Sequence, residues 1–125
     1  MIVLDASVVV EILRATRTGL ALASRLRAAD RALAAPELLD IEVLHVFRRL
    51  ARRADVGAAV ALLGDLPIER FGHAVLRPRI WALRENLTPY DAAYVALAEA
   101  LDAPLWTRDA RLRDAPGARV SVELV

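Results

Sequence analysis

The sequence predicts an α/β fold in which helices cover both faces of a parallel β-sheet. Short apolar runs alternate along the whole chain with longer segments whose apolar residues recur at helical spacing. Strands that alternate with helices are joined by right-handed crossovers, and such connections produce a parallel sheet. The length of 125 residues suits one domain with its own core. We therefore expect a single domain over residues 1–125, built as a helix–sheet–helix sandwich.

The predicted strands are the short runs rich in valine, isoleucine and leucine. The first begins directly after Met1 and ends at Asp5. Each of the later runs follows a helical segment, as expected for crossover connections. The predicted strands are residues 2–5, 32–35, 68–71, 104–107 and 119–124.

The predicted helices are recognised by their apolar spacing and by their first residues. Thr88 and Pro89 begin the clearest helix, because threonine is a common N-cap and proline suits the first turn. For the same reason Pro36 is expected to open a long helix. Pro78 lies near the start of the predicted helix 73–86, so the first residue of that helix is not fixed by the sequence. The predicted helices are residues 6–14, 18–30, 36–53, 55–63, 73–86, 88–101 and 109–114.

The composition excludes several classes of chemistry. The chain has no cysteine, which excludes disulfides, thiolate zinc sites and cysteine nucleophiles and agrees with a cytoplasmic location. All 17 basic residues are arginine. The absence of lysine excludes the phosphate-binding P-loop and Schiff-base catalysis. The net charge of +1 gives no argument for or against nucleic acid.

The chain is apolar for a soluble protein, with 57% hydrophobic residues. Its longest apolar stretches, residues 56–63 and 92–98, are far shorter than the roughly 20 residues that cross a bilayer. The N-terminus has no basic segment and reaches Asp5 at once, so it does not resemble a signal peptide. We expect no membrane association, and attribute the apolar excess to a buried sheet and a surface reserved for a partner.

Four carboxylates occupy positions where they could meet. Asp5 ends the first strand, and Asp109 directly follows the fourth. Asp91 lies in the first turn of its helix, and Glu42 lies early in a mainly apolar helix. Carboxyl ends of strands and N-termini of helices line the crevice of an open α/β sheet, which is where all four could converge.

Each acid also has a purely structural interpretation. Asp5 and Asp109 could cap the helical segments that follow them, and Asp91 could form a capping box with Thr88. Glu42 could pair with Arg49. As a group, however, the acids would repel one another unless they stay protonated or a cation lies among them. Oxygen ligands without cysteine or a matched histidine pair favour Mg²⁺ or Mn²⁺.

Four segments carry a resemblance to the PIN-domain ribonucleases. Residues 3–8 (VLDASV) are similar to the first family motif, and residues 39–43 (LDIEV) contain the second acid. Residues 88–98 (TPYDAAYVALA) are similar to the third motif and are the most specific. Residues 105–112 (LWTRDARL) resemble the fourth. The match spans most of the chain, and the subfamily it most resembles is that of the VapC-type toxins of VapBC toxin–antitoxin systems.

The resemblance implies a PIN-like three-layer sandwich around a five-stranded parallel sheet and an Mg²⁺- or Mn²⁺-dependent endoribonuclease. It implies an RNA substrate, a cognate antitoxin partner and a homodimer. The acids that carry over as metal ligands and catalytic groups are Asp5, Glu42, Asp91 and Asp109. Two polar residues, Ser7 and Thr107, carry over as groups that support these acids.

RNA-binding groups are predicted from position alone. Four arginines near the expected crevice are candidates for phosphate contacts, although ordinary solvated surface is the simpler interpretation. These candidates are Arg14, Arg17, Arg108 and Arg111. We interpret the arginines of residues 48–53 as complements to a helix dipole.

Other functions remain open at this point. A PIN-like module that binds RNA or protein without cleaving it would keep the same fold. A receiver domain or a phosphatase would need a lysine, which the chain lacks. An apolar groove between the first two helices could accept a helix of the antitoxin, with ordinary core packing as the alternative. The proposed groove residues are Val8, Val9, Ile12, Leu13 and Leu20.

Overall fold

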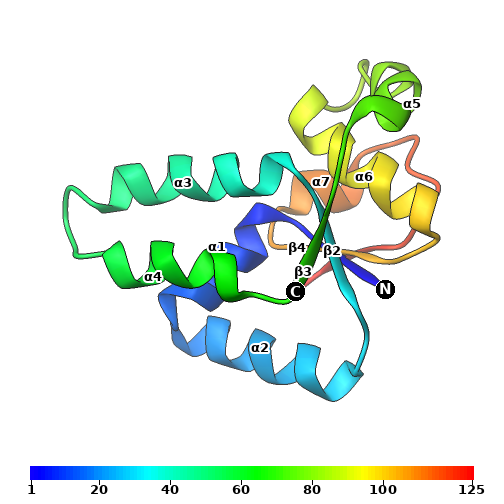
Figure 1. The fold of residues 1–125 in the computed structure, drawn as a ribbon. Helices are drawn as coiled ribbons and strands as arrows, with labels where there is room; N and C mark the ends of the chain where they lie inside the picture. Colours follow the sequence, from blue (N-terminus) through cyan, green and yellow to red (C-terminus); the bar gives the residue numbers. More distant parts are fainter.

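Five short parallel strands form one sheet at the centre of the molecule (Figure 1). The structure is a computed structural model that describes all residues, 1–125. The strand order is β3-β2-β1-β4-β5, and every neighbouring pair is parallel. This confirms the predicted fold class. The strands are β1 (Ile2–Leu4), β2 (Leu33–Pro36), β3 (Ile68–Phe71), β4 (Leu105–Thr107) and β5 (Val122–Leu124).

Helices cover both faces of this sheet, as the sequence predicts. Helices α1 to α4 lie on one side, and α5 and α6 lie on the other (Figure 1). The helices are α1 (Ala6–Arg14), α2 (Arg17–Ala29), α3 (Leu38–Leu50), α4 (Gly57–Leu62), α5 (Arg77–Ala82), α6 (Pro89–Leu101) and α7 (Ala110–Asp114). Two short 3₁₀ turns cover Leu63–Asp65 and Ala74–Leu76.

The core lies between the sheet and helices α1, α3 and α6. Strands β1 and β4 are buried along their whole length, and so are seven consecutive residues of α6, from Ala92 to Ala98. Tyr94 and Phe47 are the largest of the fully buried side chains. The apolar excess of the sequence is therefore largely explained by this interior.

Helices α1 and α2 cross very closely, and a glycine makes this possible. A Cβ atom added to Gly19 would lie 1.9 Å from the backbone oxygen of Glu11. No other residue fits this crossing without moving one of the helices. Helix α2 begins at Arg17, one residue before its predicted start. Thr16 is its N-cap and accepts a hydrogen bond from the Gly19 N–H at 3.0 Å.

The structure corrects the prediction that Pro36 opens a helix. Pro36 is the last residue of β2 and is paired with Phe71 of β3, and α3 begins only at Leu38. Proline lacks an N–H and is disfavoured within a sheet, but Pro36 lies at the end of β2, beyond the residues of β2 that pair with β1. The local sequence cannot distinguish the two positions.

A second correction concerns residues 73–86, predicted as one helix. They form a 3₁₀ turn, the short helix α5 and a further turn. Pro78 lies in the first turn of α5, which accounts for the break before it.

The predicted apolar groove between the first two helices is wrong in most of its residues. Val8, Val9 and Leu13 belong to the core, and only Leu20 is largely exposed.

None of the helices has both the length and the apolar character needed to span a bilayer.

Candidate active site

The strand order places a crevice at the carboxyl ends of β1 and β4. The chain leaves β1 towards β2 and β3 on one side and later returns to β4 and β5 on the other. Such a reversal point is where open α/β sheets leave room for a ligand. Asp5 directly follows β1, and Asp109 lies two residues after β4, so both border this crevice.

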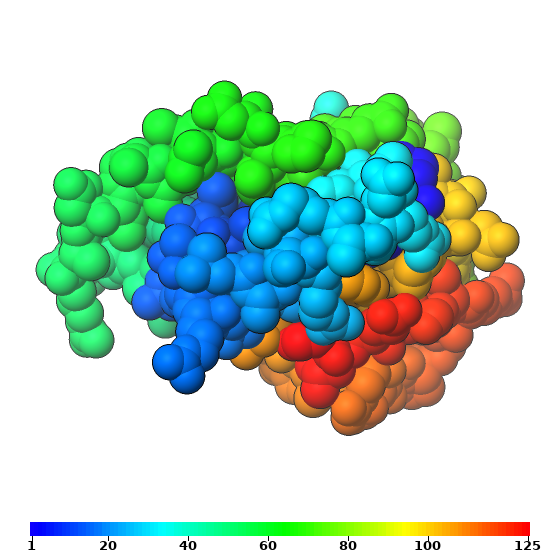
Figure 2. Space-filling model, turned by 90° about the horizontal axis from the view of Figure 1, so that it is seen from below, coloured from blue at the N-terminus to red at the C-terminus, as the bar shows by residue number.

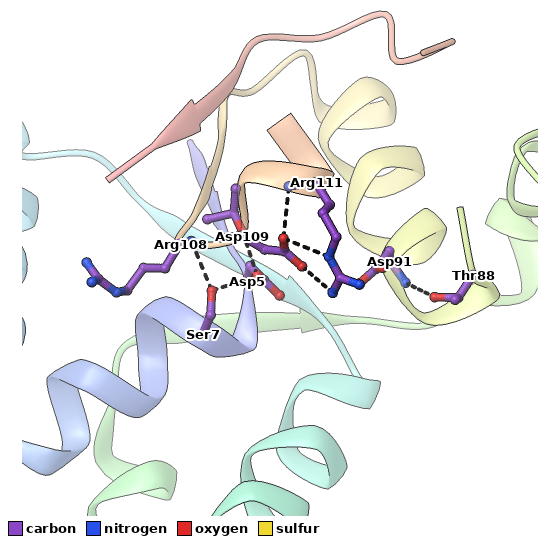
Figure 3. Close-up of polar contacts among 8 residues, drawn as sticks. Asp5, Ser7, Thr88, Asp91, Arg108, Asp109 and Arg111 are labelled. Carbon is purple, nitrogen blue, oxygen red and sulfur yellow. Dashed lines mark hydrogen bonds and ion pairs between the residues drawn. The ribbon is translucent and has the colours of Figure 1, made fainter. Parts of the chain in front are cut away.

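Asp5 is buried at this point and is the N-cap residue of α1, but only its backbone oxygen accepts hydrogen bonds from the helix. Its Oδ2 accepts hydrogen bonds from Ser7 Oγ and from Thr107 Oγ1, each at 2.7 Å (Figure 3). Its side chain makes no capping bond to α1. Burial raises the pKa of Asp5 above its ordinary value of 3.8, although the two hydroxyl groups act in the opposite direction. Capping by the side chain of Asp5 is therefore not what the structure shows.

Ser7 and Thr107 connect the two strand ends as well as holding Asp5. Ser7 Oγ accepts a hydrogen bond from the backbone N–H of Arg108 at 3.0 Å. Thr107 Oγ1 accepts one from the N–H of Asp109, also at 3.0 Å. Each hydroxyl thus donates to Asp5 and accepts from the loop that carries Asp109. This network fixes the orientation of Asp5 relative to that loop.

Glu42 reaches the same region from the second turn of α3. Tyr94 Oη donates a hydrogen bond to Glu42 Oε1 at 2.6 Å, which leaves Oε2 without a protein partner. Burial raises the pKa of Glu42, and the nearby charges of Asp5 and Asp91 add to this while the Tyr94 hydrogen bond opposes it. Glu42 makes no ion pair with Arg49, so that structural interpretation is not realised.

Asp91 projects from the first turn of α6. Its backbone N–H donates to Thr88 Oγ1 at 3.2 Å, so threonine is the N-cap that the sequence predicts. Burial raises the pKa of Asp91, and the charges of Asp5 and Asp109 raise it further. Asp91 therefore feels the charges of both other acids.

Asp109 differs from the other three acids because a cation holds it. Arg111 donates to both of its carboxylate oxygens, with an Nη2–Oδ2 distance of 3.0 Å (Figure 3). Asp109 Oδ1 also accepts the backbone N–H of Arg111 at 2.9 Å, which is the helix cap expected for this position. The side-chain bond to Arg111 lowers the pKa of Asp109. Both predicted interpretations of this acid, cap and site, are compatible with its position.

The donor set suits a hard divalent cation in its chemistry. Three buried or half-buried carboxylates with raised pKa values would be stabilised in their charged form by a cation among them. In the structure as it stands, no group of three or more Asp, Glu, His or Cys side chains is arranged to hold a metal ion. The ion pair between Asp109 and Arg111 would have to break before Asp109 could join the other three acids as a metal ligand.

Tyr94 is the site residue that sequence reasoning missed. It follows Asp91 by three residues on α6, so both side chains lie on the same face of the helix. Its ring is fully buried, while its hydroxyl contacts Glu42. Burial and this hydrogen bond raise the pKa of Tyr94 far above its ordinary value. The helical spacing from Asp91 was the signal that could have identified it.

The four predicted RNA-binding arginines lie in different environments. Arg14 pairs with Glu11 at 3.8 Å, and Arg108 donates to the backbone oxygen of Val125. Arg111 is held by Asp109. Arg17 is exposed and has no side-chain hydrogen bond or ion pair.

Comparison with known proteins identifies one family. The family model described as PIN domain matches residues 2–118. Ribonuclease VapC12 of Mycobacterium tuberculosis is 39% identical over 130 aligned residues, covering 100% of this chain and 99% of that protein. Ribonuclease VapC1 of the same species is 46% identical over 100 residues, 73% of each chain. A toxin–antitoxin complex from Klebsiella pneumoniae contains the same fold, with a TM-score of 0.70 at 19% identity and coverage of 100% of this chain and 98% of that one.

Proposed function

The chain belongs to the PIN domain family and, within it, to the VapC ribonucleases, and we propose that it is the endoribonuclease toxin of a type II toxin–antitoxin module. The proposal is supported by acids from four separate segments, which follow β1 and β4 or lie early in α3 and α6 and whose charges act on one another. Asp5, Glu42 and Asp91 are coupled electrostatically, and Asp109 is coupled to Asp5 and Asp91. A non-catalytic binding module would have no need to bury mutually repelling carboxylates.

We propose that these acids hold Mg²⁺ or Mn²⁺. Asp5 and Asp91 would be its direct ligands, with Glu42 and Asp109 binding directly or through water. When bound, such an ion lowers the pKa of a coordinated water and neutralises charge on the scissile phosphate.

The chain's own residues supply orientation and a proton acceptor. Ser7 and Thr107 hold Asp5 in one rotamer by bonding the same oxygen. Tyr94 holds Glu42 through Oε1 and leaves Oε2 free to accept a proton from the attacking water. In-line attack by this water forms a bond to phosphorus and breaks the bond to the 3′ oxygen, which takes a proton from solvent, so that a 5′-phosphate and a 3′-hydroxyl are left.

The proposal is tested by incubating a mixed RNA pool with and without Mg²⁺ or Mn²⁺, using the wild-type chain and an Asp91→Asn variant. We expect metal-dependent cleavage that falls by at least about 100-fold in the variant, because a ligand and its charge are removed. Asp102→Asn is the matched control. It makes the same change at the other end of α6, at an exposed residue with φ of 47°, a conformation that asparagine tolerates well.

Two outcomes would contradict the assignment. Normal cleavage by Asp91→Asn would show that the chemistry lies elsewhere. A folded wild-type chain that cuts no RNA with either metal would favour the binding-module alternative. Loss of activity in Asp102→Asn as well would point to damage to α6 and not to the site.

We further propose that the antitoxin binds an apolar groove of about 530 Å³ between α2 and the strands β2 and β3. Side chains of α1, α2 and both strands line it, among them Ile12, Leu26, Leu33 and Ile68. An amphipathic helix would bury these side chains.

We also propose a homodimer. Several large apolar side chains are exposed, among them Ile41 at 69%, Trp81 at 68% and Val75 at 87%, and a second copy of the chain could bury them. Light scattering of the lone chain tests this, and a monomer would contradict it.

A further inference from the structure

The uncompensated positive charge of the chain is concentrated at the far end of α3. Most of the arginines are engaged by a carboxylate, a backbone oxygen or an aromatic ring. Seven of the 17 have no such side-chain partner, and four of these seven lie within six consecutive residues. The four, here called the α3 arginine cluster, are Arg48, Arg49, Arg52 and Arg53.

This cluster is fully available to a ligand. All four residues are exposed. They lie where α3 turns back into α4, and this hairpin reaches away from the sheet in Figure 1. Its teal to green end stands out from the body of the molecule in Figure 2. Complementing the helix dipole would account for a charge here, but none of these guanidinium groups bonds to a carbonyl oxygen of the helix end.

The same face of α3 carries Glu42 and Arg49, one of the four arginines of the cluster. Arg49 follows Glu42 by seven residues, which is two helical turns, so the two side chains point in nearly the same direction. Arg53 lies just beyond the end of α3, in the turn of residues 51–53, where its own N–H and that of Ala54 both bond to the oxygen of Leu50 at 3.0 and 3.1 Å. The rise of a helix places Arg49 about 10 Å along the axis from Glu42, and Arg53 follows it beyond the helix end.

We propose that the α3 arginine cluster binds the phosphate backbone of RNA next to the cleavage site, with Arg49 and Arg53 making the main contacts. This inference rests on the proposed function. The acidic crevice repels RNA and the net charge of +1 cannot attract it, so a local source of positive charge is needed. Guanidinium groups pair with phosphate in a bidentate manner, and the position of Arg49 in line with Glu42 lets one strand contact both.

The test measures binding and not cleavage. A fluorescent single-stranded RNA, long enough to cover the roughly 10 Å between Glu42 and Arg49 and to extend past Arg53, is titrated with protein in EDTA at several salt concentrations. We compare the wild type with Arg49→Ala/Arg53→Ala and with Arg27→Ala/Arg119→Ala. The second pair is the matched control, because it removes two exposed arginines elsewhere whose side chains have no hydrogen bond or ion pair.

We expect Arg49→Ala/Arg53→Ala to weaken RNA binding about five- to tenfold at low salt and to reduce the salt slope by about 1.4, as expected for two lost single-strand phosphate contacts. The control pair should change neither quantity by more than about twofold. A charge-retaining Arg49→Lys/Arg53→Lys variant should recover most of the affinity, and circular dichroism should show all variants folded.

Three results would overturn the proposal. Equal losses in the test and control pairs would mean that only total charge matters. Unchanged RNA binding by Arg49→Ala/Arg53→Ala would show that the cluster does not contact RNA, and would favour an acidic protein as its partner. A wild type that binds no RNA would also overturn it, and the cleavage assay with metal then shows whether the proposed function fails as well.

Discussion

At the scale of single residues, the four acids of the site differ in their partners. Asp109 forms an ion pair with Arg111, and the other three acids form no ion pair. Asp5, Glu42 and Asp91 have raised pKa values, chiefly because they are buried, while Arg111 lowers the pKa of Asp109. The charge of Arg111 is also felt by Asp91. Arg111 thus takes part of the role that a divalent cation would have in this site.

Arg111→Gln should therefore tighten the binding of Mn²⁺ to the chain. The substitution frees both oxygens of Asp109 and removes a charge that repels the ion, while the backbone cap from residue 111 can remain. We expect about a twofold to fivefold lower dissociation constant, since the lost pair is exposed. Calorimetric titration or Mn²⁺ electron paramagnetic resonance measures this directly.

Arg113→Gln is the matched control for this measurement. Arg113 pairs with Asp114 at 2.6 Å on the same short helix, but Asp114 is not part of the acidic group. Its replacement should leave the Mn²⁺ affinity unchanged. Weaker binding in Arg111→Gln would mean that Arg111 orders Asp109 for the metal and does not compete with it.

At the scale of elements, helix α6 connects the site to the rest of the fold. Its first turns carry Asp91 and Tyr94, its middle is buried against the sheet, and Glu99 near its end holds two other segments. Glu99 bonds both Nε and Nη2 of Arg79 in α5, at 2.7 and 3.1 Å. It also accepts the N–H of Arg119 at 2.8 Å, just before β5. One carboxylate thus joins α5, α6 and the approach to the last strand.

Glu99→Ala should lower the free energy of unfolding by about 2 kcal/mol, because it removes charge-assisted hydrogen bonds from a side chain that is only 13% exposed. Equilibrium unfolding in urea measures the change. Glu85→Ala provides the comparison, since Glu85 is 80% exposed and makes only a 3.7 Å pair with its neighbour Arg84. A similar loss of unfolding free energy in both variants would show that the hydrogen bonds of Glu99 to Arg79 and Arg119 do not stabilise the fold.

At the scale of the whole molecule, the acids affect stability in two opposing directions. A carboxyl whose pKa is raised by folding makes the folded state less stable as pH rises above its ordinary value, 3.8 for Asp and 4.5 for Glu. A carboxyl whose pKa is lowered, such as Glu99, stabilises the fold above that value and loses the contribution as pH falls. The metal-free protein should therefore be most stable in mildly acidic solution.

We expect the free energy of unfolding of the metal-free chain to decrease as the pH rises from the ordinary pKa values of 3.8 for Asp and 4.5 for Glu towards neutrality, as the site acids become charged. Asp91→Asn should flatten this decrease and stabilise the chain at neutral pH by about 1 kcal/mol, while losing activity. Asp102→Asn should keep the wild-type profile. Denaturant unfolding in EDTA across this pH range is the measurement, and a profile that rises towards neutral pH would contradict the expectation.

How much of this could be predicted from the sequence depends on the range of the interaction. Strand and helix order follow from local periodicity, and the N-cap Thr88 lies three residues from its partner. Helix α1 has the predicted bounds for the same reason. The four acids were identified because each directly follows or opens an element, or lies in an apolar helix where a charge is costly.

The sequence by itself determined the α/β class, the single parallel sheet and the acids that border it, because these depend on short-range patterns. Only the tertiary structure decided that Pro36 ends a strand, that Tyr94 holds Glu42 from 52 residues away, and which arginines are free. Hydrogen bonds and ion pairs between distant segments depend on how the elements pack, and a lone side chain does not reveal its partner. The cluster at the end of α3 illustrates this, since its lack of partners is a property of the folded chain.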